Sequence, residues 1–169
     1  RNMFVHKRMT AYKESGKVYD VMRMNPYAEE CFREFEGVNV IETKGSELIS
    51  ILESGCVDTV CVHFLDREMW EILKSFLDKI RLIIWQHGAE VQPWWRREYN
   101  YKNEEELEEG KKQSDIRMKL WYEIFEAAKA NPSIEFVYVS QYFADEVMGD
   151  YKIQLNKSQY KIIHNMIDT

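Results

Sequence analysis

The amino-acid sequence predicts an α/β fold, namely a Rossmann-like, three-layer α/β/α domain with a mainly parallel sheet. Short apolar segments rich in β-branched and aromatic residues mostly alternate with longer segments of helical periodicity. This alternation is typical of a parallel sheet that is covered by helices on both faces. With 169 residues, the chain is long enough to bury the core of one such domain.

The first third of the chain begins with an expected helix rather than a strand. Its apolar residues recur at helical spacing, and Gly16 is a natural stop after it. We assign no helix or strand to the segment Asn25–Glu36. We expect Ser46 to cap a short helix that ends near Gly55. The expected elements are the helix Met3–Ser15 and the strands Val18–Met24 and Val38–Glu42.

The remaining elements alternate more regularly. The helix at Glu104–Ala130 begins with three glutamates, which suit the positive end of the helix dipole, and Asn131–Pro132 ends it. We expect strands at Asp58–Phe64, Arg81–Gln86, Ile134–Ser140 and Tyr160–Asn165, and further helices at Asp66–Leu77, where Asp66 is the cap, and Gln141–Met148.

Charge and composition exclude some classes of protein. The net charge of −6 argues against a protein that binds nucleic acid. No apolar run approaches the roughly 20 residues that span a bilayer. The three cysteines have no CxxC spacing, and Cys61 lies in an apolar run, so we expect it to be a reduced core residue. These features favour a cytoplasmic protein.

The strongest candidate for chemistry is His87. It follows the expected strand Arg81–Gln86, and ligands of open parallel sheets bind beyond the carboxyl ends of the strands. A histidine there can accept a proton or orient a hydroxyl, and Gly88 permits a tight turn or the close approach of a ligand. The alternative is a loop histidine bonded to the backbone.

Aromatic and charged residues follow His87 and form a candidate binding loop. Aromatic rings can stack on sugars or lie at a membrane surface, and arginines can bind phosphate. Each residue taken alone also has a plainer interpretation, as a solvated charge or a core aromatic. The candidates for acceptor binding are Gly88, Glu90, Trp94, Trp95, Arg96 and Arg97.

Two secondary candidates lie at the same predicted edge. His63 precedes Phe64 at the end of the strand Asp58–Phe64 and is a weaker candidate than His87, since a satisfied core histidine is its plainer interpretation. Ser140 is best explained as a helix cap, because a nucleophile would need a partnered base. The sequence has no GxSxG elbow, no glycine-rich phosphate loop and no zinc pattern, so we expect no metal site.

Five motifs in order resemble one known family. They resemble the amino-terminal, acceptor-binding domain of family 4, GT-B type glycosyltransferases, and the match runs along nearly the whole chain. The motifs are "NMFVHKRMTAYKESGKVYDV", "VHFLD", "IIWQHGAE", "FVYVSQYFADEVM" and "YKIIHNMIDT".

This resemblance implies one half of a GT-B fold. Residues 1–164 would form the acceptor domain, with its first strand before Arg1, and residues 165–169 would begin the crossover to a carboxyl-terminal donor domain. Met166 stands where the family commonly has Pro or Gly. In the family, transfer usually retains the anomeric configuration and needs no metal, and the "HG" lies in the cleft near the reacting sugars. The chain alone would then be inactive.

The implied partners are a glycan or lipid-linked acceptor and, in the longer enzyme, a nucleotide sugar that the donor domain mainly binds. No cofactor is expected, and a peripheral contact with the inner face of the membrane is a further expectation. Two other classes remain open: a non-catalytic glycan- or partner-binding Rossmann-like module, and a His-dependent α/β hydrolase, which the missing nucleophile elbow disfavours.

Overall fold

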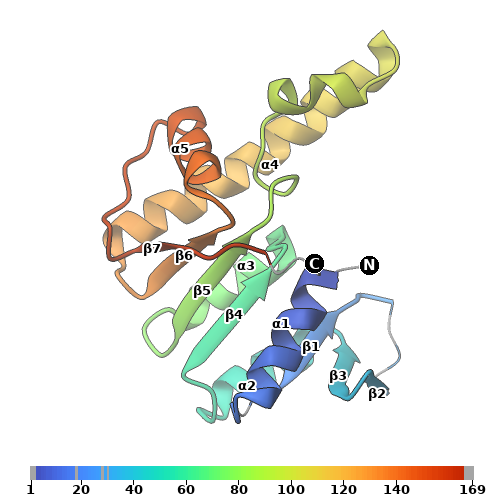
Figure 1. Cartoon of the computed structure of the whole chain (residues 1–169), viewed down its shortest axis with the longest axis vertical. Helices are drawn as coiled ribbons and strands as arrows, with labels where there is room; N and C mark the ends of the chain where they lie inside the picture. Colours follow the sequence, from blue (N-terminus) through green and yellow to red (C-terminus); the bar gives the residue numbers. More distant parts are fainter. Residues whose placement is uncertain (1–2, 18, 28, 30, 166–169) are drawn as a thin grey trace. The chain divides into compact units, whose positions relative to one another are not determined.

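The computed structural model describes residues 3–17, 19–27, 29 and 31–165, and these form two compact units. The first unit contains the described residues up to Val57 together with Asn165, and the second contains Asp58–His164. The units are described separately below. Each contains one β-sheet and at least two helices (Figure 1).

The first unit is a small mixed sheet with two helices. Its sheet has the order β1-β3-β2, in which β1 is parallel and β2 is antiparallel to β3. The elements in chain order are α1 (Met3–Glu14), β1 (Val21–Met24), β2 (Cys31–Phe35), β3 (Val38–Thr43) and α2 (Gly45–Glu53).

Strand β2 lies inside the segment that the sequence left without an element. It is joined to β3 by the two-residue turn Glu36–Gly37, in which φ is 48° and 76°. Positive φ at both residues is the signature of a type I′ turn, whose twist matches that of a hairpin. Helix α2 also differs from the prediction, because it begins at Gly45 with Lys44 as its cap, and the Ser46 hydroxyl bonds to a glutamate side chain instead.

The second unit is built on a four-stranded, fully parallel sheet of order β4-β5-β6-β7. The predicted mixed α/β class and mainly parallel pairing are therefore confirmed. Its elements are β4 (Thr59–His63), α3 (Arg67–Leu73), η1 (Lys74–Phe76), β5 (Arg81–Gln86), η2 (Trp94–Asn100), α4 (Glu104–Ala130), β6 (Ile134–Tyr138), α5 (Gln141–Asp150) and β7 (Tyr160–Ile162).

Side-chain caps begin the helices of this unit. Asp66 accepts a hydrogen bond from the backbone N–H of Met69, as the sequence predicted, and Asn103 accepts one from Glu106 at the start of α4. These caps satisfy donors that a helix leaves unpaired in its first turn. Over the described residues, no helix has both the length and the apolar character needed to cross a bilayer.

Helices α4 and α5 cover one face of the parallel sheet. The ring of Phe125 in α4 lies 5.2 Å from that of Phe136 in β6, and Phe143 in α5 packs edge-on against Tyr138. A second helical layer on the opposite face remains a prediction. Cys61 lies on that opposite face, in the edge strand β4, and is exposed, so the expectation that it belongs to the core was wrong.

One ion-pair cluster ties α3 to α4 and gives a prediction on pH. The Glu123 carboxylate accepts hydrogen bonds from Arg67 and, at 2.8 Å, from the indole N–H of Trp70, and these bonds lower the pKa of Glu123 to about 2. A depressed carboxylate pKa contributes stability above its unfolded value of about 4.3, and this contribution is lost as the pH falls through the folded value.

We therefore expect Glu123→Gln to lower the free energy of unfolding by about 1 kcal/mol at neutral pH, since the group is partly exposed and screened. The difference between the wild type and the variant should shrink as the pH falls from about 4.5 towards 2. Urea denaturation at several pH values measures it. A difference that persists unchanged at the lowest pH would contradict the assignment.

Candidate functional site

The carboxyl ends of β4 and β5 bring together the two histidines that the sequence singled out. His63 is the last residue of β4 and lies opposite Trp85 in the register with β5. Its Nδ1 atom lies 2.9 Å from Nε2 of His87, which follows β5 directly. The primary and the secondary candidate therefore form one hydrogen-bonded pair, which we call the histidine pair.

Aromatic rings enclose the histidine pair in a stack. The rings of Trp85 and His63 are stacked with centroids 5.3 Å apart, and those of His63 and His87 are 5.1 Å apart. Phe64 lies on His87 with its centroid at 4.6 Å. The stack fixes the planes of both imidazoles, so their hydrogen bond has one orientation.

The backbone at Phe64 is strained. Its φ is +58°, a region that bulky side chains rarely adopt, and the ring that contacts His87 belongs to this residue. Strain of this kind costs on the order of 1–3 kcal/mol and persists where the surrounding structure enforces it, which is common at functional sites. The strand end thus keeps an unfavourable conformation that places an aromatic face on His87.

A tight turn follows His87 and holds it by its main chain. Gly88 has a φ of +135°, and its carbonyl accepts hydrogen bonds from the N–H groups of Val91 and Gln92. The Glu90 carboxylate accepts a hydrogen bond from the backbone N–H of His87. Glu90 therefore orients the His87 backbone, and Gly88 is required by the backbone conformation.

Three consecutive carbonyls of this turn each accept a hydrogen bond from a side chain beyond it. The indole N–H of Trp121 donates to the carbonyl of Glu90, and the Tyr151 hydroxyl donates to that of Val91 at 2.7 Å. Arg117 donates to the third carbonyl, that of Gln92, at 3.2 Å. The turn is therefore held in place by side chains of α4 and by Tyr151, the residue after α5.

Two buried polar side chains lie at the same strand ends. Gln86 and Tyr138 are neighbours in the register of β5 and β6, and both are fully buried. Burial raises the pKa of the Tyr138 hydroxyl. Within the described residues, neither the Gln86 amide nor this hydroxyl has a hydrogen-bond partner, and such groups typically cost about 1–3 kcal/mol each. A buried polar side chain thus directly precedes His87 in the chain.

The two adjacent tryptophans lie in η2, a short helical segment where the sequence suggested a loop. The backbone N–H of Trp94 donates to the Ser114 hydroxyl at 2.9 Å, and Lys111 lies 5.0 Å from the centre of the Trp94 ring. Trp95 packs edge-on against Trp94 and keeps 43% of its surface exposed. Trp94 is therefore partly structural, whereas Trp95 presents a free aromatic face.

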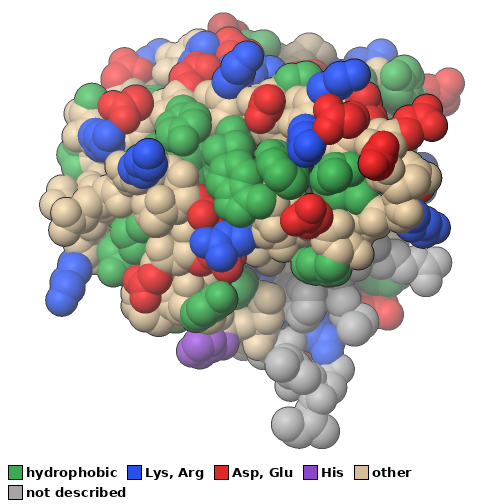
Figure 2. All heavy atoms as spheres, turned by 90° about the horizontal axis from the view of Figure 1, so that it is seen from above, with side chains coloured by type: hydrophobic (Ala, Val, Ile, Leu, Met, Phe, Trp, Pro, Cys, Tyr) green, Lys and Arg blue, Asp and Glu red, His purple; other side chains and the backbone are tan. Residues whose placement is uncertain are grey.

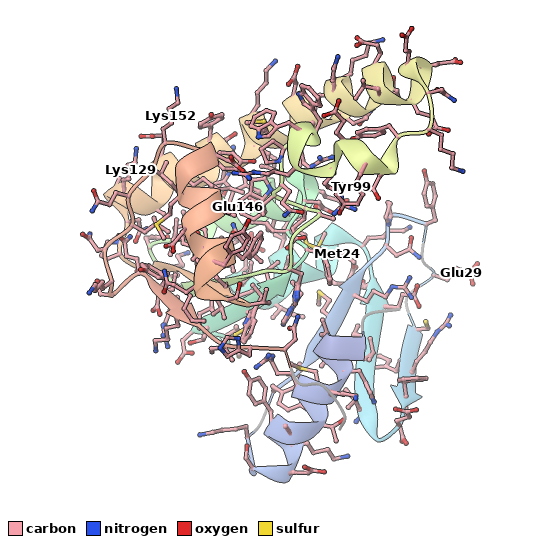
Figure 3. The ribbon with its side chains drawn as sticks, turned by 45° about the horizontal axis from the view of Figure 1, so that its top comes forward. Met24, Glu29, Tyr99, Lys129, Glu146 and Lys152 are labelled. Atoms are coloured by element: carbon pink, nitrogen blue, oxygen red, sulfur yellow. The ribbon has the colours of Figure 1, made fainter. Side chains whose placement is uncertain are left out.

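The two arginines differ in a similar way. Arg96 forms a bidentate ion pair with Asp150 through two hydrogen bonds of 2.9 Å. Its guanidinium also lies 3.5 Å from the carboxylate of Glu146 in α5, which is labelled in Figure 3. The Asp150 carboxylate raises the pKa of Arg96. A phosphate would have to compete with both carboxylates for this guanidinium. Arg97 is half-buried at a kink within η2.

Helix α4 contacts the end of η2 through a glycine. A Cβ atom added at Gly110 would lie 2.3 Å from the ring carbons of Tyr101, which is closer than Cβ atoms approach other atoms. Glycine in a helix interior normally costs about 1 kcal/mol relative to alanine. Here it allows the Tyr101 ring to pack directly on the helix backbone.

We expect Gly110→Ala to destabilise the protein by about 1–3 kcal/mol, because the added methyl group and the Tyr101 ring cannot both fit. In a Tyr101→Ala background the same substitution should stabilise by up to about 1 kcal/mol, since only helix propensity remains. Thermal unfolding of the four proteins tests this change of sign. If Gly110→Ala has the same effect in both backgrounds, the contact does not exist in solution.

Exposed aromatic and aliphatic side chains gather around η2, α4 and α5. Figure 2 shows hydrophobic side chains in the middle of the upper face, flanked by acidic and basic ones. Tyr99, labelled in Figure 3, is 82% exposed on η2. The exposed large apolar residues of these elements are Trp95, Tyr99, Ile116, Tyr122 and Tyr142.

The second weak candidate, Ser140, is a helix cap. Its hydroxyl accepts a hydrogen bond from the backbone N–H of Phe143 at 3.1 Å and begins α5. That was one of the two interpretations that the sequence allowed.

Sequence reasoning missed the residues that support the turn. Arg117 and Trp121 are four residues apart on α4, so they lie on one face of the helix and reach the same loop. Large side chains with a polar end, on the buried face of a long helix, are the signal that could have found them. The sequence carries no comparable signal for Phe64 or Tyr151.

The chain matches no family model, no curated protein and no solved structure.

Proposed function

We propose that this chain is the amino-terminal, acceptor-binding domain of a GT-B type glycosyltransferase, with a Rossmann-like three-layer fold. The single observation that carries the proposal is the site at the carboxyl ends of β4 and β5. There a strained Phe64, the turn at Gly88 and the histidine pair all meet. This is the edge at which open parallel sheets bind ligands.

In this proposal, His87 contacts the acceptor hydroxyl that attacks the donor sugar. A neutral imidazole can accept the proton of that hydroxyl or orient it. The turn fixed by Trp121 and Tyr151 forms the floor of the acceptor site, since a rigid wall lowers the entropic cost of positioning a substrate. The exposed face of Trp95 suits stacking on a sugar ring.

The remaining parts of the proposal come from the family resemblance. A second Rossmann-like domain, after the crossover that begins at Asn165, would hold most of the nucleotide sugar, and transfer would retain configuration without a metal. The enzyme would act in the cytoplasm on a glycan or a lipid-linked acceptor, with a peripheral contact to the membrane. The 169-residue chain by itself would not transfer sugar.

Titration of the chain with two sets of probes tests the proposed function. One set contains free glycans and polyprenyl-phosphate-linked sugars, and the other contains common nucleotide sugars. We expect weak binding of some members of the first set and hardly any binding of the second. Trp95→Ala should weaken acceptor binding far more than it lowers stability.

The matched control is Tyr27→Ala, which removes an aromatic residue that is 93% exposed in the other unit. It should leave binding unchanged. Tight binding of a nucleotide sugar by the isolated chain would contradict the division into acceptor and donor domains. Equal loss of binding in both variants would exclude a specific role for Trp95.

The exposed aromatic group on η2 and α5 favours a second candidate, a non-catalytic binding module. Trp95, Tyr99 and Tyr142 offer apolar area that a glycan or a protein partner could cover without any reaction. A sugar-transfer assay on a longer polypeptide that also carries the donor site separates the two functions. Transfer that depends on His87 supports the enzyme, and binding without transfer supports the module.

A further inference from the structure

We propose that His63 is a positioning residue for His87, which it holds in one orientation and one tautomer by sharing a single proton with it. The basis is the 2.9 Å separation between Nδ1 of His63 and Nε2 of His87. This inference rests on the proposed function only in the role it gives to His87. The shared proton itself follows from the geometry.

The geometry restricts how many protons the pair can hold. One of the two facing nitrogens must carry a hydrogen and the other must not, because an N–H···N bond needs one donor and one acceptor. One extra proton on the pair leaves this bond in place and strengthens it, since a charged donor bonds more strongly. A second extra proton puts hydrogens on both facing nitrogens and two positive charges on adjacent rings.

Charged side chains of the described residues reach the turn beside the pair from the turn itself, from α4 and from α5. Strands β4 and β5 contribute the uncharged rings of Phe64 and Trp85. The turn contributes the Glu90 carboxylate, which favours a positive imidazole, and α4 contributes Arg117, which opposes it. On α5, the Glu146 carboxylate accepts a hydrogen bond from the Gln92 amide.

The outer nitrogens of the pair, Nε2 of His63 and Nδ1 of His87, are buried. Burial disfavours the addition of a proton to either of these nitrogens. An acceptor reaches Nδ1 of His87 only when the side chains around it move.

The direction of the shared bond determines what His87 can do. If His87 donates from Nε2 to His63, its Nδ1 is a proton acceptor. An acceptor hydroxyl can then give its proton to Nδ1 while its oxygen bonds to the anomeric carbon, and the bonding electrons of the cleaved sugar–phosphate bond leave with the nucleotide. The positive charge is shared through the hydrogen bond to His63. The proposed function requires this tautomer.

Nitrogen-15 NMR of the histidine side chains tests the proposal on the 169-residue chain. Two-bond proton–nitrogen spectra distinguish the two tautomers and the charged form of each imidazole. We would record them between about pH 4 and pH 9, which brackets the ordinary histidine pKa of about 6.5. In the wild type, His63 and His87 should each report the same two steps of protonation, separated by about one pH unit or more.

Two variants distinguish a shared proton from two neighbouring histidines that titrate independently. His63→Phe keeps an aromatic ring beside His87 and removes the bond, so His87 should titrate in a single step. His63→Gln keeps a polar side chain and serves if the phenylalanine variant does not fold. The matched control is His164→Gln, because His164 bonds to the carbonyl of Val139 and should not affect the pair.

Independent single steps for His63 and His87 in the wild type would overturn the proposal, as would a His87 titration that His63→Phe leaves unaltered. Failure of the proposed function would give a different NMR result. In that case the coupled steps and the single tautomer persist, but none of the glycan or polyprenyl-phosphate-linked probes shifts the His87 signals.

Discussion

Replacement of His87 by alanine is expected to lower the rate of sugar transfer by about 100-fold or more, because a positioned proton-transferring group typically contributes that much. The assay requires a polypeptide that carries the donor site together with residues 1–169. The loss should appear mainly in kcat, since in the proposed function His87 acts on the reacting hydroxyl and Trp95 supplies acceptor affinity. Steady-state kinetics with varied acceptor measures both constants.

A matched control for this substitution is His164→Ala, which removes another histidine that follows a strand of the same sheet, β7. It is exposed and should leave transfer unchanged. Wild-type kinetics for His87→Ala, in a protein whose melting curve is unaltered, would make His87 a structural residue.

The second large effect concerns the support of the turn. Trp121 is fully buried, packs 5.8 Å from the ring of Phe125, and donates to the carbonyl of Glu90. Trp121→Ala should therefore lower the free energy of unfolding by about 3–5 kcal/mol, as the removal of a large core aromatic does. Trp70→Ala should cost a similar amount, since Trp70 is also buried and also donates from its indole. Urea denaturation of both variants gives the values.

A milder pair of substitutions separates packing from support of the site. Trp121→Phe and Trp70→Phe each keep an aromatic ring and remove one indole donor. Only Trp121→Phe should increase hydrogen exchange at the backbone N–H groups of Val91 and Gln92, because only that residue bonds to the turn. Equal exchange in the two variants would show that the turn does not depend on the bond to Trp121.

Several elements could be predicted because their signals are local. The apolar run of β5 and the ends of α4 agree with the sequence prediction to the residue. An apolar run has a clear length, and the glutamates of the first turn together with Asn131–Pro132 mark the two ends of α4. Strand β2 was missed because the turn that pairs it with β3 begins with Glu36, which is unusual where φ is positive.

The candidate site could be predicted only in outline. Parallel strands end at one edge, so His63 and His87 could be expected near each other, but their hydrogen bond depends on the register of β4 and β5. The bond from Trp121 to the turn depends on where α4 lies on the sheet. That position results from the packing of many side chains, and no single residue in the sequence reveals it.

The hydrogen bonds to the three carbonyls after Gly88 have a consequence for how this protein can change. The turn is held through its main chain, so most substitutions of an exposed side chain there leave the anchoring bonds intact. Ala89 is exposed within the turn and is the natural position to vary. Under the proposed function, a library at this position should alter the choice of acceptor while most of its members still fold. The turn would then be a place where new specificities evolve or are selected in the laboratory.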